Sequence, residues 1–267
     1  MTALLQLTDL RKAYAGVHAL DGVSFAVAAG SITGLIGPNG SGKSTAIDCL
    51  SGFQKLDGGK VVLAGTDITG KLAHHIARAG LMRTFQTVRI YERLSLRDNL
   101  AIAAQQFDSA TWVDEFFRTR RYRDAVAESE KRANELVDLI GLRKYYEIET
   151  GILSYGQKKL VALASALMPH PRIVVLDEPV AGVNPSRIRE IEVALQRLNQ
   201  AGETFLIVEH NVEFITNLCH RVIVLEQGRK LAEGTAAEIH TDSRVLEAYL
   251  GMTPEMAVAE AEMRGAA

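Results

Sequence analysis

The stretch that decides the fold of this chain is Gly37-Pro38-Asn39-Gly40-Ser41-Gly42-Lys43-Ser44-Thr45. An apolar run from Ile32 to Ile36 precedes it and predicts a buried strand, while Ala46 to Leu50 predict the start of a helix. A strand, a glycine-rich loop and a helix in this order form the context that a phosphate-binding loop requires. The stretch therefore predicts a phosphate site at a strand-to-helix turn.

The residue types in this loop suit a triphosphate. Gly37, Gly40 and Gly42 let the backbone approach an anion without a Cβ in the way. Successive amide N–H groups can then converge on the β- and γ-phosphates, aided by the positive end of the helix dipole. Lys43 brings a mobile cation that reaches both phosphates, and the Ser44 hydroxyl can ligate Mg²⁺. A turn with purely steric glycines would not need Lys-Ser-Thr at its end, so we expect a nucleotide site.

Length and composition limit the classes of protein to consider. The chain has 267 residues, of which 47% are hydrophobic and 23% charged, an ordinary globular balance. Its net charge of -2 gives no reason to expect nucleic acid or an anionic membrane as a partner. Cys49 and Cys219 form no metal pattern, which favours packing roles in a reduced, cytosolic chain. Because Met1 to Asp9 lack a signal-peptide pattern and no apolar run reaches the ~18 residues of a membrane span, we expect any membrane role to come through a partner.

A second apolar run, Ile173 to Leu176, ends in two carboxylates, Asp177 and Glu178. Continuous apolar strands of this kind lie centrally in parallel sheets. Two buried acids without partners would be costly, so a metal ion and a water molecule are the expected partners. Neighbouring strand residues point to opposite faces, so both acids can reach a nucleotide only if the strand stops between them, which Pro179 favours. We expect Asp177 in the Mg²⁺ shell and Glu178 as a general base for the attacking water, a role that contributes ~10²–10⁴-fold.

The sequence predicts a second phosphate-binding helix N-terminus at Leu153-Ser154-Tyr155-Gly156-Gln157. This segment begins a long helix that runs to about Met168. Ser154 is a good N-cap, and capping alone could explain it. The helix N-terminus nevertheless exposes a hydroxyl and free N–H groups, as a phosphate site would. One chain does not need two such devices, which indicates a site shared between two molecules.

Three further polar side chains suit a nucleotide site, and each has a structural alternative. Tyr14, after the predicted strand Leu4–Leu10, could pack at a sheet edge or stack on a nucleobase. Gln86 ends a short predicted strand, where its carbonyl oxygen could join a Mg²⁺ shell or cap a turn. His210 follows the predicted strand Thr204–Val208 and could be a satisfied structural group or a partner of the γ-phosphate.

Between the phosphate loop and Ser154 the alternation of strands and helices is interrupted. Tyr91 to Ile152 are mostly helical in pattern, and we expect an inserted helical subdomain at about residues 88–165. Its clearest helix, Ala125 to Ile140, has five apolar residues on one side: Val126, Ala133, Leu136, Val137 and Ile140. A basic cluster has few aromatic neighbours and predicts a solvated face: Arg118, Arg120, Arg121 and Arg123.

Local signals place the ends of the later elements. Asn184 followed by Pro185 predicts the start of a helix. A hairpin is predicted to turn at Gln227-Gly228, and Thr235 with Glu238 forms a capping box. After the last predicted helix, residues 252–267 are alanine-rich and predict a frayed helix or a disordered tail.

The order of these pieces resembles the nucleotide-binding subunit of ATP-binding cassette (ABC) transporters, over about residues 5–250. The matching pieces are Tyr14, the phosphate loop, Gln86, the signature at 153–157, the acidic pair and His210. The resemblance implies an α/β P-loop NTPase (RecA-like) fold with a mainly parallel core sheet, an N-terminal antiparallel β subdomain and the inserted helical subdomain. It implies one ATPase domain at residues 1–251.

The resemblance also implies roles for the open positions: Tyr14 on adenine, Gln86 sensing Mg²⁺ and the permease, and His210 on the γ-phosphate. The implied catalytic residues are Glu178, His210, Gln86 and Lys43. The implied ATP-binding residues are Tyr14, Gly37, Pro38, Asn39, Gly40, Ser41, Gly42, Lys43, Ser44, Thr45, Ser154, Gly156 and Gln157. The implied Mg²⁺ ligands are Ser44, Gln86 and Asp177.

Two positions depart from the family pattern. The signature has Tyr155 where the family usually has glycine, and the loop after the acidic pair has Asn184 where the family usually has aspartate. Ser154 and Gly156, the members expected to face phosphate, are retained, so the site is not expected to be inactive. Asn184 lacks the negative charge of the usual aspartate, and this change affects the expected contact with a second cassette.

Within the family, three segments resemble bacterial importers of branched-chain amino acids: 80–86, 180–185 and 245–251. The implied partners are a second cassette, a related chain rather than an identical copy, the transmembrane permeases, and indirectly a periplasmic receptor, with no nucleic acid. The implied location is peripheral, on the cytoplasmic face of the bacterial inner membrane. Importers of urea and other amides share the pattern and remain an alternative.

Two other classes of function explain the sequence less well. Soluble cassette ATPases of ribosomes or DNA usually carry two cassettes or long coiled coils, and this chain has one cassette without sustained heptads. A phosphate-loop kinase for small molecules would leave the Ser154 signature and His210 unexplained.

Overall fold

The computed structural model describes residues 3–105 and 119–250, and these form two compact units. The first unit contains residues 3–79 and 204–250, and the second contains residues 80–105 and 119–203. The phosphate loop and His210 belong to the first unit. The signature, Gln86 and the acidic pair belong to the second.

The first unit contains an antiparallel sheet with the strand order β2-β1-β4-β5. Its strands are β1 (Ala3–Tyr14), β2 (Val17–Ala28), β4 (Gly58–Leu63) and β5 (Thr66–Asp67). Both β1 and β2 are longer than the alternation in the sequence predicts, because they pair with each other up to a two-residue turn at Ala15-Gly16. Both turn residues have positive φ, 46° and 86°, as tight hairpin turns require. Tyr14 therefore ends a strand at the tip of a hairpin.

The first unit also contains four strands in the order β10-β9-β3-β8. They are β3 (Ile32–Ile36), β8 (Phe205–Val208), β9 (Arg221–Glu226) and β10 (Arg229–Gly234). β3 pairs in parallel with both β8 and β9, while β10 returns antiparallel along β9. Every residue of β3 and β8 is buried, which confirms the prediction that the apolar run before the phosphate loop is a buried strand.

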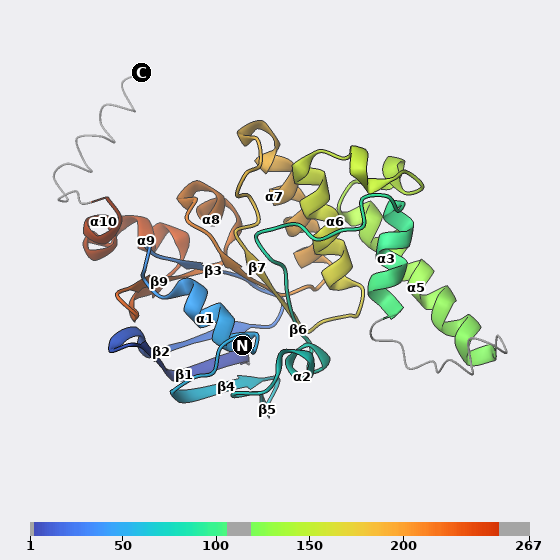
Figure 1. The fold of residues 1–267 in the computed structure, drawn as a ribbon. Coiled ribbons are helices and arrows are strands. Elements are labelled where there is room, and N and C mark those ends of the chain that lie inside the picture. Colours follow the sequence, from blue (N-terminus) through green and yellow to red (C-terminus); the bar gives the residue numbers. More distant parts are fainter. Residues whose placement is uncertain (1–2, 106–118, 251–267) are drawn as a thin grey trace, which may run out of the picture. The chain divides into compact units, whose positions relative to one another are not determined.

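The helices of the first unit are α1 (Lys43–Leu50), α2 (Ala73–Arg78), α8 (Val212–Leu218), α9 (Ala236–Thr241) and α10 (Ser243–Leu250). α1 lies between the two sheets of this unit (Figure 1), and it is buried at Ala46, Ile47, Cys49 and Leu50. The phosphate loop is thus anchored at both ends in the core. Burial raises the pKa of the Cys49 thiol to about 11 and that of Cys219 to about 12, as expected of packing residues.

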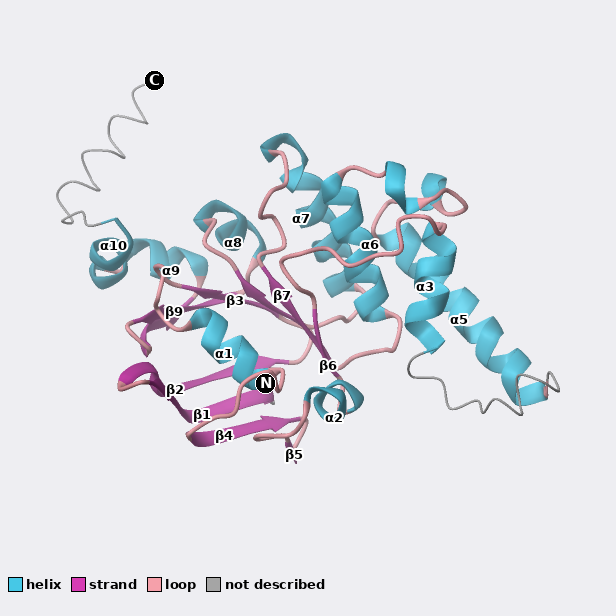
Figure 2. Ribbon diagram, viewed as in Figure 1, coloured by secondary structure: helices cyan, strands magenta, loops and turns pink. Residues whose placement is uncertain are grey.

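The second unit pairs two short parallel strands with a group of helices, coloured by type in Figure 2. The strands are β6 (Leu81–Arg83) and β7 (Ile173–Asp177). The helices are α3 (Leu96–Gln105), α5 (Arg120–Leu139), α6 (Tyr155–Leu167) and α7 (Pro185–Gln200), with 3₁₀ turns at Arg143–Tyr145 and Thr150–Ile152. The described parts of the predicted insert, residues 88–105 and 119–165, are mostly helical, and they belong to one compact unit with β6, β7 and α7.

The buried side of α5 differs from the prediction at one position. Ala133, Leu136, Val137 and Ile140 are buried, but Val126 is 39% exposed. Val126 lies in the second turn of α5, more than a turn before the buried segment. Arg120, Arg121 and Arg123 are exposed, as predicted for a solvated face, while Arg118 and residues 252–267 lie outside the described residues.

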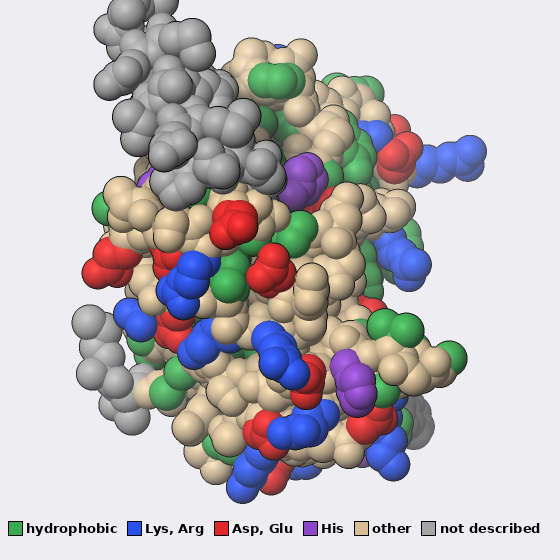
Figure 3. Space-filling view, turned by 90° about the vertical axis from the view of Figure 1, so that its left-hand side faces the viewer, with side chains coloured by type: hydrophobic (Ala, Val, Ile, Leu, Met, Phe, Trp, Pro, Cys, Tyr) green, Lys and Arg blue, Asp and Glu red, His purple; other side chains and the backbone are tan. Residues whose placement is uncertain are grey.

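Charged side chains of both signs alternate on the face shown in Figure 3, so this face carries no continuous basic field. Among residues 3–105 and 119–250, the structure has no helix that is both long and apolar enough to cross a bilayer.

Candidate nucleotide site

The phosphate loop requires glycine at two positions because of what lies against them. A Cβ on Gly37 would lie 2.3 Å from the carbonyl oxygen of Leu225, and one on Gly42 would lie 2.4 Å from that of Ala19. Gly40 has no atom within 4 Å of such a Cβ, but its φ of +79° is one that L-residues rarely adopt. The glycines therefore have a steric role in addition to the predicted opening of the backbone to an anion.

The loop is supported by the β9–β10 turn, a contact that the sequence did not indicate. The amide of Gly228 donates to the Ser41 carbonyl at 3.0 Å, and the amide of Asp21 donates to the Gly228 carbonyl at 2.7 Å. The Arg229 guanidinium lies 2.6 Å from the Asp21 carboxylate and, as the main cause, lowers its pKa. The turn at 227–228 was predicted only as a hairpin, and its role in holding the loop depends on sheet packing.

Lys43 places its ammonium group on the loop itself. Its Nζ donates to the carbonyl oxygens of Gly37 at 2.7 Å and Pro38 at 3.0 Å, and lies 3.4 Å from Oγ of Ser41. Asn39, Gly40 and Ser44 are exposed along the loop, whereas Ser41 is buried. A cation held at the start of a helix, beside exposed loop backbone, favours binding of an anion there.

His210 extends from the end of β8 into solvent, with its side chain 62% exposed. The backbone from which it extends is held by Glu209, which is 1% exposed and whose Oε2 accepts from the backbone amides of His210 and Asn211 at 3.0 and 3.2 Å. Glu209 thus closes the turn into α8, a role that the sequence analysis missed. Since the imidazole is exposed, it is not a buried structural group.

Tyr14 is 43% exposed at the hairpin tip, and Nζ of Lys12 lies 5.2 Å from its ring centroid. This exposure does not fit the packed edge-strand alternative. The ring remains accessible for stacking, and its contact with adenine stays a prediction.

In the second unit, β7 ends at Asp177, and Glu178 adopts a left-handed conformation with φ of +48°. The strand therefore stops between the two acids, as predicted. A non-glycine residue held in this conformation costs of order 1–3 kcal/mol, so the surrounding contacts must impose it. One such contact is the ammonium of Lys159, which donates to the Glu178 carbonyl at 2.6 Å.

Both acids have side-chain partners within this unit. The Arg83 guanidinium lies 2.9 Å from Oδ2 of Asp177, and Nε2 of Gln86 donates to Oε2 of Glu178 at 2.8 Å. The structure thus brings Gln86 and Glu178 together, although the sequence analysis treated them separately. Nothing in the local sequence of Arg83 marks it as a site residue.

The signature forms a complete capping box at the start of α6. The Ser154 hydroxyl accepts from the Gln157 amide at 3.4 Å, and Oε1 of Gln157 accepts from the Ser154 amide at 2.9 Å. A hydrogen bond with Gln157 is the main cause that lowers the pKa of Tyr145. Gly156 packs against Val183, where a Cβ would lie 3.3 Å from Cγ1. The N-cap prediction is confirmed, and a phosphate role for Ser154 stays a prediction.

The two departures from the family pattern have local contacts. The Tyr155 hydroxyl donates to the Gln86 carbonyl at 3.4 Å, and its ring packs on Gly182. Asn184 caps α7, its side-chain oxygen accepting from the Ser186 amide at 3.1 Å and hydroxyl at 2.8 Å. Tyr155 therefore links the signature to the segment around Gln86, and Asn184 performs the capping that aspartate would perform.

A Mg²⁺ ion would depend on the nucleotide for part of its shell. Among the described residues, no cluster of three or more His, Cys, Asp or Glu side chains could hold a metal. The predicted ligands Ser44, Gln86 and Asp177 supply a hydroxyl, an amide oxygen and one carboxylate, which is the sparse oxygen set that Mg²⁺ accepts when phosphates and water complete it. By type these donors suit Mg²⁺, and their joint ligation of the ion stays a prediction, because Ser44 belongs to the first unit and Gln86 and Asp177 belong to the second.

Comparison with known proteins indicates the family of this chain. The ABC transporter family matches residues 20–181, and the family described as branched-chain amino acid ATP-binding cassette transporter matches residues 229–251. The high-affinity branched-chain amino acid transport ATP-binding protein BraF of Pseudomonas aeruginosa is 32% identical over 249 residues, covering 93% of this chain and 98% of its own. The probable branched-chain amino acid transport ATP-binding protein LivG of Archaeoglobus fulgidus is 36% identical, covering 93% and 95%.

Two solved structures share the fold. A nucleotide-free ATP-binding cassette from an ABC transporter superposes with a TM-score of 0.78, at 33% identity, covering 94% of this chain and 100% of that one. The ADP conformation of an ATP-binding cassette of an ABC transporter gives 0.80, with the same identity and coverage. The expected P-loop NTPase fold is thus confirmed, and the chain belongs to the ABC transporter family as one of its ATP-binding subunits.

Proposed function

We propose that this chain is the ATP-hydrolysing subunit of an importer for branched-chain amino acids. The substrate class is supported by relatives named for branched-chain amino acid transport, which match 93% of the chain. The branched-chain family also matches residues 229–251. The phosphate loop and acidic pair supply the chemistry of ATP hydrolysis.

The residues divide the work of hydrolysis as follows. The loop amides and Lys43 hold the β- and γ-phosphates, and Tyr14 stacks on adenine. Glu178 accepts the proton of the attacking water, while Gln86, hydrogen-bonded to it, orients the carboxylate. Ser44, Gln86 and Asp177 would hold Mg²⁺, which would supply positive charge against the phosphates. His210, whose side chain is exposed and whose backbone amide is held by Glu209, donates to the γ-phosphate.

We infer that a second cassette completes each site. The motivation is that the chain carries two helix N-termini built for phosphate, one behind Lys43 and one at Ser154. ATP on the loop of one subunit is contacted by Ser154 and Gly156 of the other, so closure of the dimer depends on ATP and reverses after hydrolysis. The second cassette is a related chain in the assembled importer.

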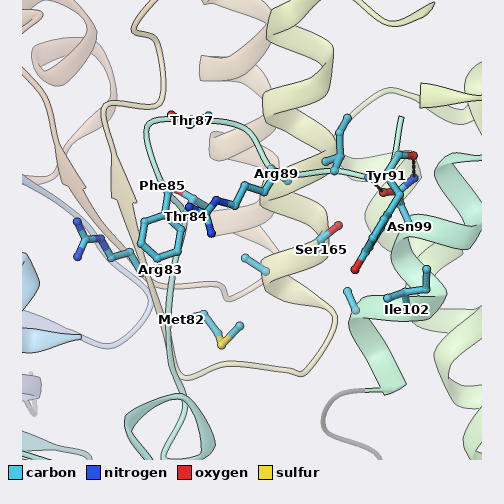
Figure 4. A pocket seen from close by; sticks show the side chains of 14 residues that line it. Met82, Arg83, Thr84, Phe85, Thr87, Arg89, Tyr91, Asn99, Ile102 and Ser165 are labelled. Carbon is cyan, nitrogen blue, oxygen red and sulfur yellow. Dashed lines mark hydrogen bonds between the residues drawn. The ribbon is translucent and has the colours of Figure 1, made fainter. Parts of the chain in front are cut away.

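The permease contacts a cavity in the second unit. This cavity has a volume of about 540 Å³, and its lining includes Phe85, Arg89, Tyr91 and Ile102 (Figure 4). Its lining includes Phe85 and Thr87, the chain neighbours of Gln86, so a cytoplasmic permease segment seated there would contact the residues on either side of the one that orients Glu178. The subunit then acts at the cytoplasmic face of the inner membrane, and a periplasmic receptor reaches it only through the permeases.

Substitution of Glu178 by Gln tests the motor. We expect Glu178→Gln to lower ATP turnover by ~10²–10⁴-fold while ATP still binds, because the general base is lost and the phosphate loop is intact. With ATP and Mg²⁺, size-exclusion chromatography should show a stable dimer. If this chain does not pair with itself, the dimer should form when the related cassette subunit is added. A strict monomer under both conditions, or unchanged turnover, would contradict the proposal.

The substrate class needs a separate measurement. Vesicles containing the complete importer should take up leucine, isoleucine or valine only when ATP is inside, and unlabelled urea should not compete. Competition by urea or another amide would instead assign the chain to the amide importers that share the sequence pattern. Cofractionation with ribosomes in place of membranes would contradict both.

A further inference from the structure

Arg83 is the residue whose place in the second unit the proposed function leaves unexplained. It is the last residue of β6 and pairs in register with Val175 of the parallel strand β7. Its side chain is 9% exposed, and that of Asp177, 2.9 Å away, is 17% exposed. A charge-assisted hydrogen bond with so little access to water is a strong one, so each side chain fixes the position of the other.

The carboxylate that Arg83 holds is also the proposed Mg²⁺ ligand. The guanidinium occupies Oδ2 of Asp177 at contact distance, and its positive charge repels a divalent cation that approaches the same carboxylate. In a partly buried site this repulsion is screened less than at the surface. The carboxylate has a second oxygen, so ligation of a cation by Asp177 is opposed by the charge of the guanidinium, and not blocked, while the ion pair persists.

We propose that Arg83 is a positioning residue that competes with the divalent cation for Asp177 and so sets the metal concentration that the site needs. The proposal rests on the assignment of Asp177 to Mg²⁺ in the proposed function. The nucleotide-free chain keeps the carboxylate neutralised and fixed in place, and the site is completed when nucleotide and metal arrive together.

A matched control lies beside Arg83. The guanidinium carbons of Arg83 and Arg89 lie 5.1 and 5.7 Å from the centroid of the same Phe85 ring. Both arginines line the cavity, and Figure 4 shows Arg83 pointing away from the part where Tyr91 and Asn99 lie. The ion pair with Asp177 belongs to Arg83, so Arg89→Met removes a similar cation without touching the proposed competition.

The experiment titrates Mn²⁺, as a spin-active substitute for Mg²⁺, into the full-length chain with a non-hydrolysable ATP analogue and follows free Mn²⁺ by electron paramagnetic resonance. We expect Arg83→Met to tighten Mn²⁺ binding by about three- to tenfold, since one positive charge next to the ligand is removed. Arg89→Met should leave the Mn²⁺ affinity unchanged. Arg83→Lys keeps the positive charge but loses the planar guanidinium group, so its Mn²⁺ affinity should be intermediate.

Two further measurements make the outcome decisive. Binding of a fluorescent ATP analogue in EDTA should be the same in Arg83→Met and the unmodified chain, which also shows that the variant is folded. If Arg83→Met does not fold, the comparison rests on Arg83→Lys. Unchanged or weaker Mn²⁺ binding in a folded Arg83 variant would overturn the proposal. Asp177→Asn should weaken Mn²⁺ binding, and if it does not, the assignment of Asp177 to the metal fails instead.

Discussion

The phosphate loop and the signature are both helix N-termini suited to phosphate, but they are built in different ways. At the loop the conformation comes from backbone: Gly37 and Gly42 have positive φ and backbone carbonyls against their Cα atoms. At the signature it comes from side chains: Ser154 and Gln157 form a capping box within four residues. The loop is held by distant strands of its own unit, whereas the signature is held by its own helix.

This difference indicates how each device tolerates change. A loop that depends on close backbone packing cannot accept even one added methyl group at the packed positions. A capping box can lose its serine and keep the helix at modest cost, so a large effect of Ser154 on activity would have to come from a ligand or partner and not from the fold. Four predictions test this contrast, in order of decreasing effect.

The largest effect is expected from Gly42→Ala. Its Cβ would lie 2.4 Å from the Ala19 carbonyl, so the loop must rearrange and ATP affinity should fall by at least ~100-fold, equivalent to ~3 kcal/mol. Gly30→Ala is the matched control, because Gly30 also has positive φ, +68°, but no atom within 4 Å of the added Cβ. It should cost only ~1–2 kcal/mol of stability and leave ATP affinity intact. Fluorescent-nucleotide binding and thermal unfolding measure both, and wild-type affinity in Gly42→Ala would refute the packing argument.

The next effect is expected from Ser154→Ala, compared with Thr235→Ala. Both residues are N-caps of complete capping boxes, at α6 and α9 respectively. Each substitution should cost ~0.5–2 kcal/mol of stability, measured by urea unfolding. Only Ser154→Ala should also lower ATP turnover, by about 10²-fold, because it removes a donor to phosphate. Equal ATP turnover in the two variants would show that Ser154 acts only as a helix N-cap.

A smaller effect is expected at Tyr155. Replacement by Gly, the usual family residue, removes the ring from Gly182 and from Lys159, whose Nζ lies 5.5 Å from the ring centroid. We expect a loss of ~1–2 kcal/mol and faster hydrogen exchange near Gln86. Tyr155→Phe loses only a 3.4 Å hydrogen bond and should stay within ~0.5 kcal/mol of the unmodified chain. A larger loss of stability in Tyr155→Phe than in Tyr155→Gly would show that the hydroxyl, not the ring, links these segments.

The smallest effect is expected from Asn184→Asp. Aspartate keeps the cap on Ser186 and adds a negative charge at the N-terminus of α7, which should stabilise the chain by ~0.3–1 kcal/mol at pH 7. The helix terminus favours the charged form and lowers the folded-state pKa, so the gain is present above pH ~4 and is lost as the pH falls through that of the folded carboxylate. Thermal unfolding at pH 7 and pH 3 measures it, and a gain that persists at pH 3 would exclude the electrostatic cause.

Local signals explain why much of the site could be predicted. Helix caps at Ser154, Asn184 and Thr235 involve partners within three residues, so the sequence contains the whole interaction. The end of β7 at Asp177 follows from one apolar run and one proline. Predictions that needed a packed partner were less accurate: β1 and β2 run longer than their alternation indicates, and Val126 is exposed despite its place in an amphipathic pattern.

By itself, the sequence determined the phosphate loop, the stop between the two acids and the capped helices, because each depends on residues close along the chain, and the order of these motifs indicated the family. The tertiary structure alone decided that Arg83 holds Asp177 across 94 residues, that Gln86 meets Glu178 across 92, and that Gly228 supports the loop. These contacts join strands and turns that approach only when the sheets form. A local sequence pattern therefore does not predict which distant side chain will make the contact.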